Sequence, residues 1–242
     1  MISHILNGDA LQEIFPLEIE GKQFISRECL CDGEVLGKTL DEFFENRAVF
    51  ISNSFSGFSK DDYYSESVAE YERIQSIPAS SDINLWFEED VFCQVNFWFV
   101  VDLLYHRFED SSFSLVLPKK GCEYSFANME ESDLEEAYEN KMDLNLDELK
   151  QLSNLWVYYK SANYDSLLSL AKRLGKKFSF ILKAVEAIIE DKNNNKVEES
   201  LKAIIVDLDT KDFVEVFKEF HRREAIYGYG DLQVKRIFEK LI

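Results

Sequence analysis

The amino-acid sequence predicts an α/β protein: an open parallel sheet of four or more strands flanked by helices, followed by an all-helical C-terminal domain. Three observations predict this fold class. Short apolar segments alternate with helical ones in the first half of the chain, as in sheets built with crossover helices. Residues 85–99 pass from an apolar segment through three carboxylates into an apolar helical segment. Beyond residue 146 the apolar spacing is typical of helices alone.

The strands are predicted from short apolar runs bounded by turn-forming or charged residues. The first run ends at Asn7-Gly8-Asp9, and the fourth ends at Pro118. Strands with few polar residues are typical of a sheet covered on both faces. The predicted strands are residues 2–6, 23–26, 83–87 and 113–117.

Capping patterns predict where two of the connecting helices begin. Asp9 followed by Gln12, and Thr39 followed by Glu42, both have the spacing of a capping box. A longer helix is predicted over 60–77 from an apolar stripe with acidic residues on the other face.

The helix predicted over residues 91–108 is apolar on most sides. A helix of this kind is expected to be covered by protein on most sides.

The second half of the chain is expected to form a separate helical domain. We place the boundary near residue 125, so that 1–125 form the sheet domain with the candidate site and 126–242 form the helical domain. An acidic helix is expected over 129–140. Asp231 is expected to cap the last helix, which runs to Leu241. The terminal helices and the turn at residues 227–230 suggest a winged-helix-like unit.

The charge of the chain is unevenly distributed. The net charge is −19, and residues 1–140 hold 9 basic and 29 acidic side chains, whereas residues 141–242 hold 18 and 17. An N-terminal half with this excess of acidic side chains repels nucleic acid and anionic membrane surfaces. Neither is therefore expected as a partner. A chain that is 46% hydrophobic has the material for a large core.

The cysteines and the N-terminus predict a cytoplasmic protein. The sequence begins without the basic and long apolar regions of a secretory signal, and the apolar run Phe97–Val101 is too short to cross a membrane. The four cysteines form no CxxC pair, so reduced thiols are expected rather than disulfides or a zinc site.

Polar residues follow three of the four predicted strands. Ligands of open parallel sheets bind at the carboxyl ends of the strands, so these residues predict a site. Glu28 and Asp90 are the candidate catalytic residues because each directly follows a strand end. The candidate ligand-binding residues are Asn7, Gly8, Asp9, Arg27, Asp32, Glu88 and Gln94.

The acidic residues suggest two chemistries. Asp9, Asp32 and Asp90 can provide the oxygen ligands of a divalent cation such as Mg²⁺. Alternatively, repulsion between carboxylates raises the pKa of one of them, which then serves as general acid or base. Arg27 can hold a phosphate or carboxylate of a substrate. A structural alternative stays open, because Asp9 and Asp90 both occupy positions where helix caps belong.

No known catalytic motif is present: the chain lacks Gly-x-Ser-x-Gly, a Walker-type phosphate loop and Gly-x-Gly-x-x-Gly. A resemblance to a known family is carried by residues 3–9, 27–28 with 32–33, 85–94, 155–156 and 229–232. As a set, these segments resemble the bacterial domain of unknown function family 1835 and the helical region that accompanies it. The resemblance implies a bacterial two-domain protein, and it supplies no established substrate.

Two classes of function follow. In the first, the protein is an enzyme of hydrolase or transferase type that binds a small polar or phosphorylated ligand in an acidic crevice at the strand ends, with or without a divalent metal. In the second, it is a non-catalytic regulatory or interaction protein, in which the α/β domain binds a ligand and the C-terminal helices report it.

Overall fold

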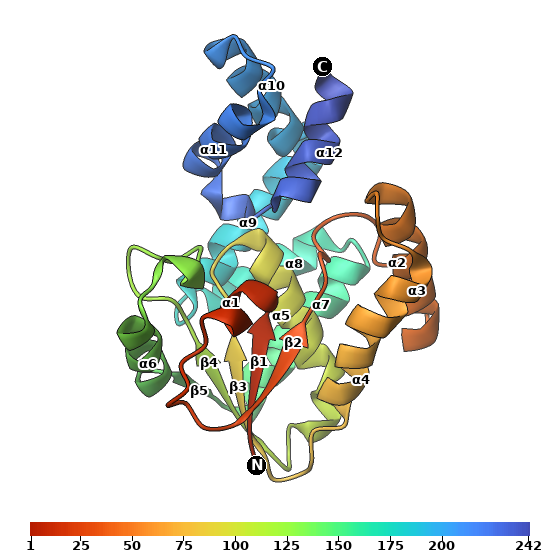
Figure 1. Ribbon diagram of the computed structural model, residues 1–242. Helices are drawn as coiled ribbons and strands as arrows, with labels where there is room; N and C mark the ends of the chain where they lie inside the picture. The colour runs from red at the N-terminus through yellow and green to blue at the C-terminus, as the bar shows by residue number, and fades with distance from the viewer.

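The computed structural model describes all 242 residues and contains one five-stranded sheet of order β2-β1-β3-β4-β5 (Figure 1). The first four strands are parallel, as predicted, and β5 pairs with β4 in the antiparallel direction. The strands are β1 (Ile2–Asn7), β2 (Lys22–Ser26), β3 (Asp82–Trp86), β4 (Ser112–Val116) and β5 (Met142–Leu144).

Helices cover both faces of the sheet, and only helices and the turns between them follow β5. In the sheet region they are α1 (Asp9–Glu13), α2 (Leu40–Ser54), α3 (Lys60–Tyr63), the π-helical turn η1 (Tyr64–Val68), α4 (Ala69–Gln75), α5 (Val91–Leu103), the 3₁₀ turns η2 (Tyr105–Arg107) and η3 (Phe126–Asn128), and α6 (Glu131–Glu139). After the sheet follow α7 (Leu146–Lys160), α8 (Tyr164–Leu174), α9 (Ser179–Asn194), α10 (Lys196–Leu208), α11 (Phe213–Arg223), the 3₁₀ turn η4 (Ala225–Tyr227) and α12 (Asp231–Leu241).

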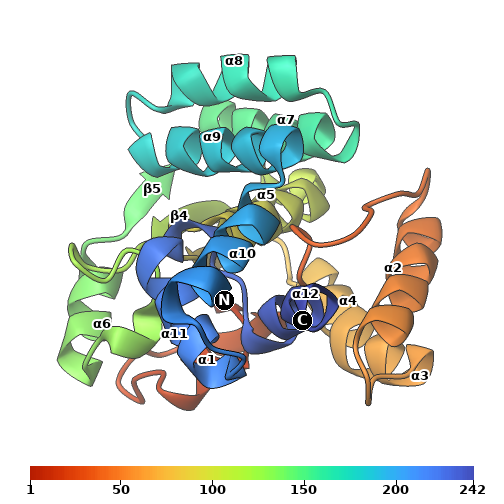
Figure 2. The same ribbon diagram turned by 90° about the horizontal axis from the view of Figure 1, so that it is seen from above.

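The layers explain why α5 is so apolar. Helix α5 lies on one face of the sheet, and α7 and α9 pack against its other side (Figure 2). Ten of its thirteen residues are buried. The opposite face of the sheet is covered by α1, η3 and α6, which pack around Trp86 and Phe126.

The cap predicted for α2 is confirmed. Thr39 accepts a hydrogen bond from the Glu42 amide at the start of this helix.

Three features differ from the sequence-based expectations. Strand β5 lies beyond residue 125, so the sheet extends past the predicted domain boundary. No strand follows Leu144, so the C-terminal helices have no β-wing and the winged-helix prediction is wrong. Neither Asp9 nor Asp231 is the predicted cap: each is the first residue of its helix, α1 or α12, and the preceding glycine holds the cap position. The Asp9 carboxylate pairs with Arg27.

Helices α10, α11 and α12 stand beyond the carboxyl ends of the strands, and the C-terminus lies at the opposite end of the molecule from the N-terminus (Figure 1). No helix is both long enough and apolar enough to cross a bilayer. All four cysteines are free thiols.

Candidate functional site

The ends of β1, β2 and β3 meet at one edge of the sheet. Asn7 of β1 is in register with Ser26 of β2, and Leu6 is in register with Trp86 of β3. The acidic segments that follow these strands therefore start side by side, as the parallel-sheet argument predicts. Their side chains, however, are bound in separate groups rather than in one shared crevice.

Glu28 is the centre of a buried ion pair. Arg47 donates to both carboxylate oxygens at 2.8 Å, from Nε and from one terminal nitrogen. Tyr63 donates its hydroxyl to Oε1 at 2.8 Å, and the Cys29 amide donates to Oε2 at 2.6 Å. Neither charged side chain is exposed. These four bonds occupy the carboxylate, so Glu28 has no free oxygen with which to take a proton from a ligand.

Arg47 also fixes the loop that follows Glu28. Its guanidinium donates to the backbone oxygens of Cys29, Asp32 and Glu34 at 3.2, 2.7 and 3.3 Å. Arg47 lies in the middle of α2, so these bonds connect α2 to the end of β2 and to the loop.

The three aspartates predicted as metal ligands are not brought together. Asp9 pairs with Arg27 at 2.5 Å, and this hydrogen-bonded guanidinium lowers the pKa of Asp9. Asp32 pairs with Arg236 of α12 at 2.5 Å. No group of three or more His, Cys, Asp or Glu side chains is arranged to hold a metal ion. The donor set expected for Mg²⁺ is therefore not formed by these residues.

A chain of polar contacts crosses the sheet edge between β1 and β3. The Cys93 thiol donates to Glu88 at 3.1 Å and accepts from Asn7 at 2.9 Å. Asn96 donates to the Asn7 side chain at 3.0 Å and to the backbone oxygen of Glu28 at 2.6 Å. Burial raises the pKa of the Glu88 carboxyl and of the Cys93 thiol. This network connects all three strand ends through α5.

Asp90 caps α5, as the structural alternative expected. Its carboxylate accepts the Cys93 amide at 2.9 Å, and the residue is 1% exposed. A Cβ built on Gly228, whose φ is +63°, would overlap this carboxylate, so only glycine fits here. Burial, followed by the nearby Glu88 charge, raises the pKa of Asp90 to about 7. Gln94 lies beside it and donates to the backbone oxygen of Glu88 at 2.8 Å.

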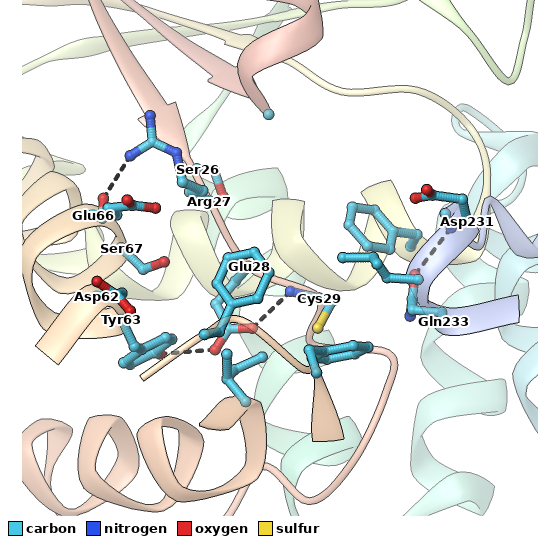
Figure 3. Close-up of a pocket in the computed structure, with 17 residues that line it drawn as sticks. Ser26, Arg27, Glu28, Cys29, Asp62, Tyr63, Glu66, Ser67, Asp231 and Gln233 are labelled. Atoms are coloured by element: carbon cyan, nitrogen blue, oxygen red, sulfur yellow. Dashed lines mark hydrogen bonds between the residues drawn. The ribbon is translucent and has the colours of Figure 1, made fainter. Parts of the chain in front are cut away.

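A pocket of about 280 Å³ opens beside Glu28, at the ends of β1 and β2. Figure 3 shows its two walls: Asp62, Tyr63 and Glu66 on one side, and Asp231 with Gln233 of α12 on the other. Gly8 and residues 26–29 line it from the strand ends. Its volume is just below the range of about 300–1,000 Å³ that is typical of small-molecule sites.

Aromatic rings and carboxylates give the pocket its chemistry. Phe55, Phe58 and Phe92 line it together with Tyr63. Asp62, Glu66 and Asp231 also line it, and none of the three is in an ion pair, although the Asp62 carboxylate accepts from the Ser59 amide and hydroxyl. Arg27 is the one cation with access to the pocket; it is held by Asp9 and by the backbone oxygen of Glu66 at 2.6 Å. The unpaired charge around the pocket is therefore negative.

Helix α12 is fastened to the α/β region next to this pocket. Arg236 pairs with Asp32, and its guanidinium lies 5.7 Å from the centroids of the Phe50 and Phe55 rings. Gln233 donates to the Cys31 thiol at 3.8 Å. The pocket is thus completed by a helix whose position depends on contacts to the loop that Arg47 holds.

The sequence reasoning missed the pocket wall formed by residues 55–66. One observation points to it: Phe58 lies in the Ser/Gly-rich segment and is 41% exposed, whereas Phe55 of the same segment is buried. The comparisons with known proteins add no further residues. No family model, curated protein or solved structure matches this chain.

Proposed function

We propose that the protein binds a small organic cation with an apolar body, such as an aromatic amine, in the pocket between the strand ends and α12. The supporting observation is the combination of aromatic side chains with three acidic residues that have no counter-ion, Asp62, Glu66 and Asp231, around one cavity. Aromatic faces and carboxylates both attract ammonium groups, and the attraction grows when water is displaced. The same negative potential disfavours a phosphorylated ligand.

The proposed role is regulatory rather than catalytic. The pocket has one wall on the α/β region and one on α12, so a ligand that contacts both walls stabilises one position of the C-terminal helices. The carboxylate of Glu28 is fully engaged, and that of Asp90 lies under Gly228. A hydrolase or transferase reaction through either residue would require these contacts to open first.

Two further parts of the proposal concern context. We propose a cytoplasmic location, which agrees with the four free thiols. We also propose that the chain is related to the bacterial family that it resembles. Residues 7–9, 27–28 and 229–232, which belong to the resembling segments, lie at or beside the pocket, so ligand binding would be a property of that family.

The experiment compares two probes of similar shape and opposite charge, tryptamine and indole-3-acetate. Tryptamine is expected to raise the melting temperature and to give a saturable calorimetric titration, because a ligand that binds only the native state stabilises it. Indole-3-acetate is expected to bind at least about tenfold more weakly, because its carboxylate faces the acidic wall. Glu66→Gln is expected to weaken tryptamine binding by a similar factor.

Glu72→Gln is the matched control, since Glu72 is an exposed residue of the neighbouring helix α4 that does not line the pocket. Equal or tighter binding of indole-3-acetate would contradict the proposed ligand class. An unchanged affinity of Glu66→Gln for tryptamine would contradict the proposed location.

A further inference from the structure

A second set of polar side chains lies at the other end of the sheet, on the face covered by α6. Asp82 and Asn84 of β3 point to this face together with their register partners on β4, Ser112 and Ser114. Asp143 of β5 is in register with Ser114 and completes the set. We call these five residues the polar panel. They line a cavity of about 530 Å³.

The panel interrupts the apolar pattern of its own face. Further along the same strands, Trp86 and Val116 are fully buried in the core under α1 and α6. Asn84 is 1% exposed and Ser114 is 7% exposed, so the base of the cavity is polar although it is buried. Buried polar groups need hydrogen-bond partners, and these two residues have them. Asn84 donates to the Ser3 backbone oxygen at 3.4 Å and accepts from Lys141, and Ser114 donates to Asp143.

Hydrogen bonds within the panel leave part of its capacity open. Ser114 donates to one oxygen of Asp143 at 2.9 Å, and Ser112 donates to one oxygen of Asp82. These bonds orient the two carboxylates, and the second oxygen of each has no protein donor. Each serine oxygen keeps its lone pairs for a further donor.

Lys141 is the cation that lines the same cavity, directly beside the panel. Lys141 donates to the Asn84 side-chain oxygen at 2.9 Å, and its ammonium lies 4.1 Å from the centroid of the Tyr138 ring. The ammonium has three hydrogens, so it can also donate to a bound molecule. The cavity therefore presents hydrogen-bond donors and acceptors side by side. The hydroxyl groups of a ligand suit this arrangement, because each hydroxyl group both donates and accepts.

The charges decide which class of ligand fits. An anion on Lys141 would lie near Asp82 and Asp143, and a cation on the aspartates would lie near Lys141. We propose that the polar panel binds a small uncharged polyhydroxylated molecule, such as a monosaccharide or cyclic polyol. This site is separate from the pocket at the carboxyl ends of the strands, and it requires no ligand there.

The test titrates the full chain with D-glucose, D-ribose and myo-inositol and follows backbone amide chemical shifts. At least one probe is expected to give saturable shifts at residues 82–84, 112–114 and 141–143. Asp143→Asn and Lys141→Met are each expected to weaken this binding by about tenfold, because each removes a charged hydrogen-bonding partner. Both residues are partly or fully exposed, so the variants keep the fold.

Ser114→Ala and Ser153→Ala form a matched pair. Ser153 donates to Asp102 at 2.7 Å in an equivalent serine–aspartate bond outside the panel. Only Ser114→Ala is expected to weaken binding. The proposal is overturned if no neutral probe gives saturable shifts at the panel, if Ser153→Ala weakens binding as much as Ser114→Ala, or if glucose 6-phosphate or glucosamine binds more tightly than glucose.

Discussion

Replacing Arg47 by methionine is expected to destabilise the protein by about 3–5 kcal/mol, because it leaves the Glu28 carboxylate buried without its counter-ion. For a chain of this size the melting temperature should fall by about 6–20 °C. The loss should exceed that of an ordinary core substitution of similar volume, since Arg47 also holds three backbone oxygens of the loop after Glu28. Chemical denaturation of both proteins measures the difference.

Two further variants separate the charge effect from lost packing. Adding Glu28→Gln to Arg47→Met removes the unpaired charge and keeps an acceptor for Tyr63, so it should recover part of the stability. Arg222→Met removes an arginine that is 70% exposed and paired with Glu219, and it should cost less than about 1 kcal/mol. If Arg47→Met cost no more than Arg222→Met, the buried ion pair would not be the anchor of this loop.

Asp90→Asn is expected to make the protein more stable at pH 8 and to flatten the dependence of its stability on pH. The pKa of Asp90 is raised from 3.8 to about 7 in the folded state, first by burial and then by Glu88. Between these two values the folded state binds one more proton than the unfolded state, so the stability of the wild type falls as pH rises from 3.8 to 7. The whole difference corresponds to about 4 kcal/mol.

Asparagine caps helices about as well as aspartate, so the cap on α5 should remain. The free energies of unfolding of the wild type and Asp90→Asn should therefore diverge by about 3 kcal/mol between pH 5 and pH 8, in favour of the variant. Asp212→Asn, the same change at the exposed cap of α11, is the control and should show no such divergence. Parallel pH profiles for the wild type and Asp90→Asn would show that Asp90 is ionised throughout this range.

Much of the fold could be predicted because it rests on local patterns. The four parallel strands follow from short apolar runs in the sequence. The burial of α5 on most sides follows from its own lack of a polar face. Strand β5 was missed because Met142–Leu144 is too short to show an alternating pattern, and pairing with β4 forms it. Asp9 has the spacing of a cap, but Arg27, which lies 18 residues further along the chain, binds it instead.

The candidate site could be predicted only in its position. The edge of the sheet follows from the strand order, but the state of each carboxylate depends on partners that are distant in sequence. Glu28 meets Arg47 across 19 residues, and Asp32 meets Arg236 across 204. No local pattern reports such pairs. The same holds for the pocket, since its second wall, residues 230–233, comes from the far end of the chain.

A crystal structure of the protein with tryptamine tests the central claim most directly. We expect the ammonium within hydrogen-bond distance of Glu66 or Asp231, with the indole ring against Phe55 and Phe58 and with α12 in place over the strand ends. Tryptamine bound elsewhere on the molecule, or no tryptamine in a crystal grown at a saturating concentration, would contradict the claim that this pocket is the ligand site.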